Sequence, residues 1–178
     1  ALIHRQIEAL RQGGIEEIAV VTGYRAEAFQ DLERTGIRSF HNADWQRSNM
    51  VRSLFEARAW LREQDCLVAY ADILYEPRLI QELGAHVWRE PQEILLPVNL
   101  NWRSLWEARF DNPLEDVESL RLNAAGQIIE IGQRVQALDE VEGQFMGLAL
   151  LQLPAWQKLE EALAQLDEQD LNRLDMTA

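Results

Sequence analysis

Asp72 is the residue whose type and position suggest chemistry most directly. It follows the apolar run at 66–70, Cys-Leu-Val-Ala-Tyr, which predicts a buried β-strand. Ligands of open α/β sheets bind beyond the carboxyl ends of the strands, and a carboxylate placed there can hold Mg²⁺ while the metal also binds phosphate oxygens. Asp72 could equally cap the helix that Pro77 is expected to open. The spacing alone does not decide between a metal ligand and a helix cap.

Asn49 and Ser53 could recognise a ligand through hydrogen bonds. An amide and a hydroxyl can together read the edge of a pyrimidine base. Their spacing also suits a simpler arrangement, in which Asn49 or Ser48 caps a helix and Ser53 lies on the surface of that helix. Taken on the residues alone, the simpler arrangement is favoured.

Two tryptophans four residues apart, Trp102 and Trp106, form the third candidate group. The faces of tryptophan rings attract ammonium groups, and choline or an aminoalkyl chain carries such a cation. Tryptophans at helical spacing also commonly fill a core. The pair therefore predicts either a cation site or a packed helix face.

The elements that must position these residues alternate between strand and helix over the first half of the chain. Apolar periodicity, glycines and Pro77 predict helices over 2–10, 26–34, 49–61 and 77–84, with β-strands over 18–22, 37–41 and 66–70. This alternation predicts an α/β fold with a mostly parallel sheet covered on both sides.

The second half of the chain has a different pattern. We expect a strand over 93–99, a hairpin of 117–122 and 127–131 around Asn123-Ala124-Ala125-Gly126, a strand over 144–153 and a helix from Pro154 to about Leu166. No repeat, low-complexity segment or flexible linker interrupts the chain. The sequence therefore predicts one domain over residues 1–178.

Composition limits the classes of partner. With 30 acidic and 17 basic residues, the formal net charge is −13, which argues against a nucleic-acid partner. No apolar run reaches about 18 residues, so no membrane partner is expected. The single cysteine, Cys66, excludes an internal disulfide and favours a reducing, cytoplasmic location. Cys66 lies in an apolar run and is expected to be a buried small hydrophobe. The three histidines are scattered along the chain and do not suggest a metal site.

Five segments in order and spacing resemble one known family. They are Val-Thr-Gly-Tyr at 21–24, Asn49 with Ser53-Leu54, Ala-Asp-Ile-Leu-Tyr at 71–75, Ile-Gly-Gln-Arg at 131–134 and Glu-Gly-Gln-Phe-Met-Gly-Leu at 142–148. Over essentially its whole length the chain resembles nucleotidyltransferases of the phosphocholine cytidylyltransferase type, which are relatives of the sugar-1-phosphate nucleotidyltransferases. The resemblance implies a three-layer Rossmann-like nucleotidyltransferase fold with a mostly parallel, mixed central sheet.

The resemblance also implies an activity and the residues of the nucleotide site. The expected reaction transfers CMP from CTP to a small phosphorylated or phosphonate acceptor, such as phosphocholine or 2-aminoethylphosphonate, and releases pyrophosphate. Asp72 matches the family's Mg²⁺-binding aspartate, and Gly23, Asn49 and Ser53 match the nucleotide-binding segments. Tyr70 stands where this branch often has a second aspartate.

On the acceptor side, the resemblance points to the tryptophan pair and to three residues near the end of the chain. Arg134 lies where the family commonly has a lysine that contacts the acceptor phosphate, and it keeps the positive charge. Trp102 and Trp106 fall near the acceptor. Glu142 and Gly147, expected on the last strand, would line the same pocket, with Glu142 able to pair with an acceptor amine.

The resemblance predicts that parts of the site lie outside these 178 residues. The family has a glycine-rich NTP loop upstream of the position of Ala1 and a second metal-binding aspartate downstream of Ala178. We therefore expect this chain alone to be inactive and the full-length protein to be a Mg²⁺-dependent enzyme, with homo-oligomer formation left open. The alternatives are a sugar-1-phosphate or molybdopterin nucleotidyltransferase, or a non-catalytic nucleotide-binding or oligomerisation module of the same fold.

Overall fold

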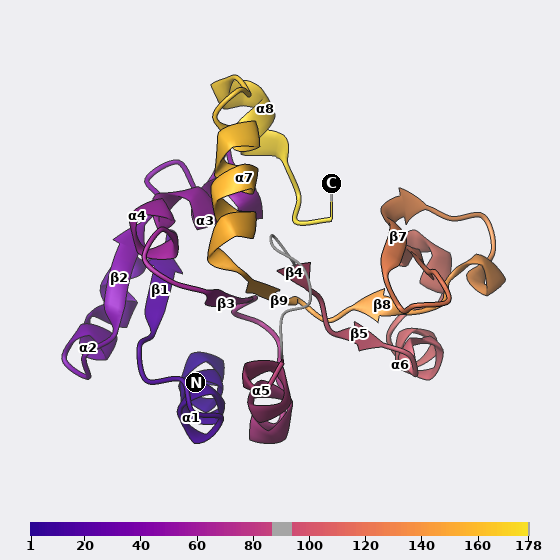
Figure 1. Ribbon diagram of the computed structural model, residues 1–178, viewed down its shortest axis with the longest axis horizontal. Helices are drawn as coiled ribbons and strands as arrows, with labels where there is room; N and C mark the ends of the chain where they lie inside the picture. Colours follow the sequence, from indigo (N-terminus) through magenta and orange to yellow (C-terminus); the bar gives the residue numbers. More distant parts are fainter. Residues whose placement is uncertain (87–93, 178) are drawn as a thin grey trace. The chain divides into compact units, whose positions relative to one another are not determined.

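The computed structural model describes residues 1–86 and 94–177 (Figure 1). The chain forms two units, which are described separately below. The first unit comprises Ala1–Leu95 and Leu150–Met176, and the second comprises Leu96–Ala149 and Thr177–Ala178.

The first unit begins with a helix and a parallel strand pair. Ile7 of the helix, Leu32 and two residues that precede the strands, Ile18 and Ile37, form a buried cluster. The register pairs Ala19 with Arg38 and ends with Thr22 opposite His41. The elements are α1 (Leu2–Gln12), β1 (Ala19–Thr22), the 3-10 helix η1 (Ala26–Phe29), α2 (Gln30–Glu33) and β2 (Arg38–His41).

A second cluster of the first unit joins helices from both ends of the chain. Val51, Leu163 and Leu171 form its buried centre. The predicted helix over 49–61 is divided at Ala57, and a short final helix that the sequence did not predict follows the predicted one. The elements are α3 (Met50–Glu56), α4 (Arg58–Leu61), α7 (Leu153–Leu163) and α8 (Glu168–Arg173).

The remaining strands of the first unit carry the segment that contains Asp72. In a three-stranded sheet, β9 (Leu148–Leu151) lies between β3 (Cys66–Ala69) and β4 (Ile94–Leu95). Helix α5 (Pro77–Gly84) has its proline in the first turn, as predicted. It lies beside α1 (Figure 1), so closely that a Cβ atom on Gly13 would collide with Ile80.

The described residues of the second unit form antiparallel strand pairs, one α-helix and two short 3-10 helices. The predicted hairpin is confirmed: β6 pairs antiparallel with β7, and Gly126 in the turn has a φ of 77°. Trp102, Val117 and Val141 form the buried cluster of this unit. The elements are β5 (Val98–Asn99), α6 (Trp102–Arg109), η2 (Pro113–Glu115), β6 (Glu118–Leu122), β7 (Ile128–Arg134), η3 (Leu138–Glu140) and β8 (Gln144–Phe145).

Two predictions of continuous strands are wrong, because each of these segments is divided into two short strands. Of the strand expected over 93–99, residue 93 lies outside the described residues, and the rest forms β4 and β5 on either side of Leu96 and Pro97. Proline has no N–H to donate to a strand ladder. The strand expected over 144–153 is divided into β8 and β9 around Gly147, whose φ of 74° leaves the extended region.

The class of fold is confirmed as mixed α/β. Parallel pairing is found between β1 and β2, whereas β4–β9, β5–β8 and β6–β7 are antiparallel.

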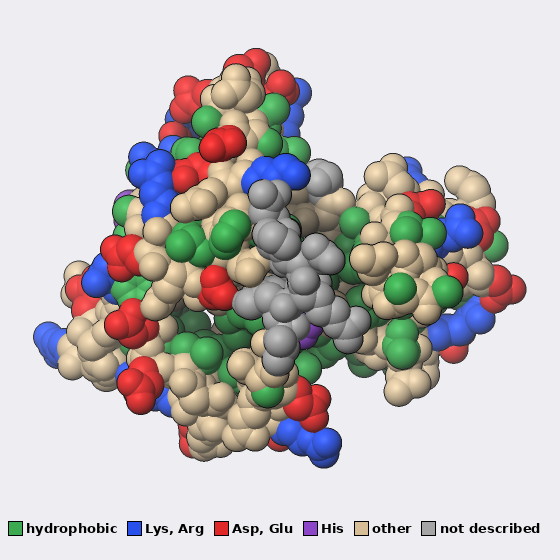
Figure 2. Space-filling model, in the orientation of Figure 1, with side chains coloured by type: hydrophobic (Ala, Val, Ile, Leu, Met, Phe, Trp, Pro, Cys, Tyr) green, Lys and Arg blue, Asp and Glu red, His purple; other side chains and the backbone are tan. Residues whose placement is uncertain are grey.

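Acidic and basic side chains are interspersed on the face shown in Figure 2. Several ion pairs join residues one helical turn apart, such as Arg78 with Glu82 at 2.8 Å. None of the helices in the described residues has the length and apolar character needed to cross a membrane.

Candidate functional site

Asp72 lies in a turn that directly follows β3. Its side chain is exposed, and its carboxylate forms no hydrogen bond or ion pair with the described residues. The alternative in which Asp72 caps the next helix is wrong, because α5 begins at Pro77 and its N-cap residue is Glu76. The carboxylate is therefore open to solvent and available to an external ligand.

Asn49 and Ser53 lie at the start of α3, where a buried amide supports them. Asn49 is the N-cap residue of α3, and its Oδ1 atom accepts a hydrogen bond from the Met50 backbone N–H at 2.9 Å, so the capping arrangement is confirmed. Asn42 is only 1% exposed, and its Nδ2 atom donates to Ser48 Oγ at 2.9 Å and to Ser53 Oγ at 3.0 Å. The Ser53 hydroxyl in turn donates to the Asn49 backbone carbonyl, over the long distance of 3.5 Å.

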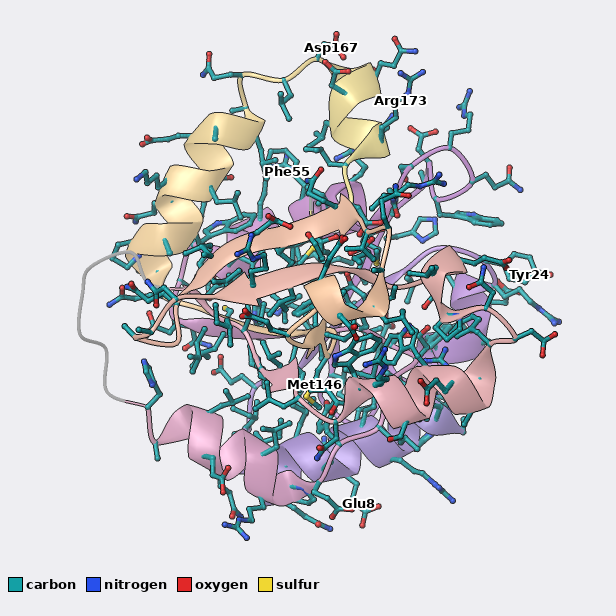
Figure 3. The ribbon with its side chains drawn as sticks, turned by 90° about the vertical axis from the view of Figure 1, so that its right-hand side faces the viewer. Glu8, Tyr24, Phe55, Met146, Asp167 and Arg173 are labelled. Carbon is teal, nitrogen blue, oxygen red and sulfur yellow. The ribbon has the colours of Figure 1, made fainter. Side chains whose placement is uncertain are left out.

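Gly23 follows β1 and lies against an aromatic side chain. A Cβ atom at position 23 would be 2.6 Å from the Cβ atom of Trp45, so a larger residue would displace the loop. The rings of Tyr24 and Trp45 have centroids 5.2 Å apart, and both side chains are exposed. Tyr24 lies at the periphery of the side chains in Figure 3.

The first unit has two open clefts. One is lined by Asp44, Arg47 and residues at the two ends of α8, its N-cap residue Asp167 and Arg173, both of which Figure 3 labels. The other lies between α1 and the segment after Asp72 and is lined in part by Glu8 and Tyr75. Neither cleft has Asp72 in its lining.

The tryptophan pair of the second unit has two different environments. Trp102 is 4% exposed and belongs to the core cluster with Val117 and Val141, as the packing alternative predicts. Trp106 is half-buried and meets Trp102 edge to face, with ring centroids 6.2 Å apart. Its Nε1 atom donates to Asp116 at 3.0 Å. The centre of the Arg109 guanidinium lies 5.4 Å from the centroid of the Trp106 ring.

The other predicted acceptor residues lie on or near the antiparallel strands. Arg134 is exposed at the end of β7, opposite Glu118 in the register. Glu142 is exposed, and its Oε2 atom accepts a hydrogen bond from the Leu122 N–H at 2.6 Å. The expectation that Glu142 and Gly147 lie on the last strand is wrong, since Glu142 precedes β8 and Gly147 separates β8 from β9.

Cys66 is not suited to nucleophilic chemistry. It is buried in β3, and its Sγ atom donates to the Gln64 carbonyl at 3.3 Å. Burial, together with the nearby Asp65 and Glu63 carboxylates, raises the pKa of the thiol to about 11. The prediction of a buried small hydrophobe is therefore confirmed, because a thiol with this pKa stays protonated near neutral pH.

One buried polar residue beneath Asp72 was not identified from the sequence. Gln6 of α1 is 4% exposed, and its Nε2 atom donates to two backbone carbonyls that flank Asp72. The available signal was its position among the apolar residues Ile3, Ile7 and Leu10. A polar side chain on the buried face of a helix requires hydrogen-bond partners.

Comparisons with known proteins identify relatives over most of the chain. The family model described as "MobA-like NTP transferase domain" matches residues 1–173, which include almost all of both units. A protein of Campylobacter jejuni named CTP:phosphoglutamine cytidylyltransferase is 38% identical over 154 residues, which are 83% of this chain and 59% of that protein.

A solved structure has a similar fold. The structure titled as the inositol-1-phosphate CTP transferase from T. maritima matches with a TM-score of 0.66 and 17% sequence identity. The match covers 90% of this chain and 61% of that structure. The chain thus spans about three fifths of each of these two relatives, and the expected nucleotidyltransferase fold is confirmed.

Proposed function

Because this chain belongs to the MobA-like NTP transferase family, we propose that the full-length protein is a cytidylyltransferase. It transfers CMP from CTP to a small phosphorylated or phosphonate acceptor and releases pyrophosphate. The observation that carries the proposal is the exposed carboxylate of Asp72 in the turn after β3, which has no partner among residues 1–86 and 94–177. The 38% identity to a protein named as a CTP-dependent cytidylyltransferase supports CTP as the nucleotide.

Asp72 is the proposed ligand of a divalent cation, and its environment fits Mg²⁺. Among residues 1–86 and 94–177, no group of three or more His, Cys, Asp or Glu side chains could hold a metal ion. Mg²⁺ does not require such a group, since it commonly binds one or two carboxylates together with substrate phosphates and water. When bound, the ion would neutralise negative charge on the triphosphate.

The nucleotide side of the proposed site uses Gly23, Asn49 and Ser53. The Asn49 Oδ1 atom is occupied by the Met50 N–H, whereas its amide N–H groups have no acceptor among the described residues and can donate to a ligand. Ser53 accepts from Asn42, and its hydroxyl donates to the Asn49 carbonyl over a long contact of 3.5 Å, which an acceptor atom of the base can replace. Donors at these two positions suit the O2 and N3 acceptors of cytosine, whereas uracil carries a hydrogen on N3. This arrangement supports a preference for CTP over UTP.

The acceptor side uses Trp102, Trp106, Arg134, Glu142 and Gly147. An arginine such as Arg134 can hold a phosphate through two parallel hydrogen bonds. Trp106 offers an aromatic face to a cationic group. Trp102, which lies in the core, packs edge to face against the Trp106 ring. The Glu142 oxygen that does not accept from Leu122 can pair with an ammonium group.

In the proposed reaction the protein mainly positions two anions. A phosphate or phosphonate oxygen of the acceptor attacks the α-phosphorus of CTP in line, the bond from that phosphorus to the bridging oxygen breaks, and pyrophosphate leaves. Arg134 holds the attacking group, while Asn49 and Ser53 fix the base. Alignment of the reactants supplies much of the rate enhancement in reactions of this kind.

Pyrophosphate release by the natural full-length protein tests the proposal. The panel contains four nucleoside triphosphates, each paired with phosphocholine, 2-aminoethylphosphonate, phosphoglutamine and a sugar 1-phosphate. We expect turnover with CTP and Mg²⁺ and an acceptor that carries an amine or quaternary ammonium group. Preference for a sugar 1-phosphate would favour the alternative enzyme class. Absence of turnover, with no calorimetric heat on addition of CTP and Mg²⁺, would favour a non-catalytic module.

A further inference from the structure

Gln6 joins α1 to the turn that carries Asp72. Its Nε2 atom donates to the Tyr70 carbonyl at 2.8 Å and to the Ile73 carbonyl at 2.6 Å. Carbonyl oxygens only accept hydrogen bonds, so the amide nitrogen must face the turn. Both N–H groups of one side chain therefore hold the two ends of the four-residue segment whose centre is Ala71 and Asp72.

The burial of Gln6 shows why this contact is well defined. The residue is 4% exposed, on the face of α1 that also carries Ile7. A buried amide that loses its partners is strongly unfavourable, so the side chain has little freedom to leave the turn. Asp72, by contrast, is exposed and has no partner in the described part of the chain. The exposed carboxylate is thus attached to a backbone turn that the buried Gln6 side chain holds in place.

We propose that Gln6 is a positioning residue for Asp72: by bridging the carbonyls of Tyr70 and Ile73, it fixes the turn that presents the carboxylate to a divalent cation. The inference rests on the proposed function, in which Asp72 binds that cation. Gln6 itself touches neither the nucleotide nor the metal. Its effect arises because a ligand that is held in place before binding loses less conformational freedom when the metal binds.

Substitution of Gln6 by Met tests the proposal with Gln12 as a matched control. Methionine keeps the length of the side chain and removes both donors. Gln12 lies on the same helix but is exposed, and within the part of the chain that the structure describes its side chain donates only to Glu8, at 3.1 Å. Gln6→Met and Gln12→Met therefore remove similar groups from one helix, and only the first removes the contact with the turn. Gln6→Asn, which keeps the amide but is one methylene shorter, serves if Gln6→Met fails to fold.

The first measurement is hydrogen exchange of the peptide that covers residues 70–76, in the full-length protein without ligands. We expect about tenfold faster exchange in Gln6→Met and no change in Gln12→Met. Unchanged exchange in Gln6→Met would overturn the inference, whatever the activity of the protein.

The second measurement is the binding of Mn²⁺, as a probe for the divalent cation, in the presence of CTP, followed by electron paramagnetic resonance. We expect Gln6→Met to weaken Mn²⁺ binding about tenfold and to raise the Mg²⁺ concentration for half-maximal turnover similarly. Excess Mg²⁺ should restore the rate, and the KM for the acceptor should change less than twofold. A loosened turn with unchanged metal binding would mean that Gln6 only stabilises the fold, and the inference would be wrong. If the wild type neither binds Mn²⁺ with CTP nor turns over, the proposed function fails and this inference fails with it.

Discussion

Asp72 of the first unit and the candidates Trp106 and Glu142 of the second unit have different hydrogen-bonding environments. In the first unit, Asp72 is exposed, has no partner within the described ranges, and is carried by a turn that buried Gln6 holds. In the second unit, Trp106 donates to Asp116 and has Arg109 beside its ring, and Glu142 accepts from the Leu122 N–H.

From this difference we expect two modes of binding. On the proposed nucleotide side, Gln6 and Asn42 hold polar groups in place before a ligand arrives, so we expect binding there to require little rearrangement. On the proposed acceptor side, Trp106 and Glu142 already form contacts within the protein, so we expect an acceptor to compete with these contacts. We expect substitutions on the nucleotide side to affect catalysis strongly and substitutions on the acceptor side to affect mainly acceptor affinity.

The largest effect is expected from Asp72→Asn. Loss of the negative charge should lower kcat/KM for CTP by about 100-fold to 10,000-fold, because residue 72 would no longer hold the divalent cation that neutralises charge on the triphosphate. The melting temperature should not change, since the carboxylate has no partner among the described residues. Glu76→Gln, a change to another exposed carboxylate four residues later, is the control and should keep full activity. Equal activity of both variants would remove Asp72 from the site.

Asn42→Ala should affect both stability and nucleotide binding. The buried amide donates to Ser48 and Ser53, and its oxygen accepts from the Asp44 N–H at 3.0 Å. Loss of these bonds should lower the free energy of unfolding by about 2–4 kcal/mol in a urea titration. In the folded variant, the preference for CTP over UTP should fall. A stable variant with unchanged nucleotide preference would show that Asn42 does not prepare this side of the site.

Trp106→Ala tests the acceptor side. We expect the KM for an acceptor with a cationic group to rise about tenfold, because the aromatic face is lost, and the KM for CTP to rise less than twofold. Steady-state kinetics with each substrate varied in turn gives both values. Trp106→Phe keeps a ring and should recover most of the affinity. Equal effects of Trp106→Ala on both KM values would instead indicate a packing role.

Arg109→Ala should have a smaller effect of the opposite sign. Arg109 lies over the Trp106 ring and is exposed, and a cation–π contact at an exposed site contributes about 0.5–1 kcal/mol. Removal of the guanidinium should therefore lower the KM for a cationic acceptor about two- to fivefold. An increase in that KM would contradict the idea that Arg109 and the acceptor compete for the ring.

The smallest effect is expected from Tyr75→Phe, close to the Asp72 turn. The buried Tyr75 hydroxyl has no hydrogen-bond partner in the described part of the chain. Burial also raises the pKa of this hydroxyl to about 12. Removal of an unpaired buried polar group should leave stability unchanged or raise it by up to about 1 kcal/mol, as measured by urea unfolding at pH 7. If the free energy of unfolding instead falls by more than 1 kcal/mol, the Tyr75 hydroxyl stabilises the fold although it has no direct partner in the described part of the chain.

Local signals in the sequence were sufficient for many elements of the fold. The β-branched run before Gly23, Pro77 at the start of α5 and Gly126 in the hairpin turn each act within a few residues, and each marks an element that the structure contains. Asn49 could be identified as a helix cap for the same reason. Pro97 and Gly147 were also visible, but their effect depends on whether a neighbouring strand requires an N–H or an extended backbone at that position.

The support of the site could not be predicted in this way. Gln6 and the turn that it holds are separated by 64 and 67 residues in the chain, so their contact exists only in the folded state. The burial of Trp102 and the partial exposure of Trp106 likewise depend on how α6 packs against Val117 and Val141. Residue types identified the candidates, whereas tertiary packing determined which of them are open to a ligand.

Isothermal titration calorimetry of the full-length protein with CTP tests the central claim most directly. The titration is performed with Mg²⁺ and with EDTA, on the wild type and on Asp72→Asn. We predict that the wild type binds CTP at least tenfold more tightly with Mg²⁺ than with EDTA, and that Asp72→Asn loses this difference. If CTP binds both proteins equally well with and without the metal, Asp72 does not hold a divalent cation beside the nucleotide.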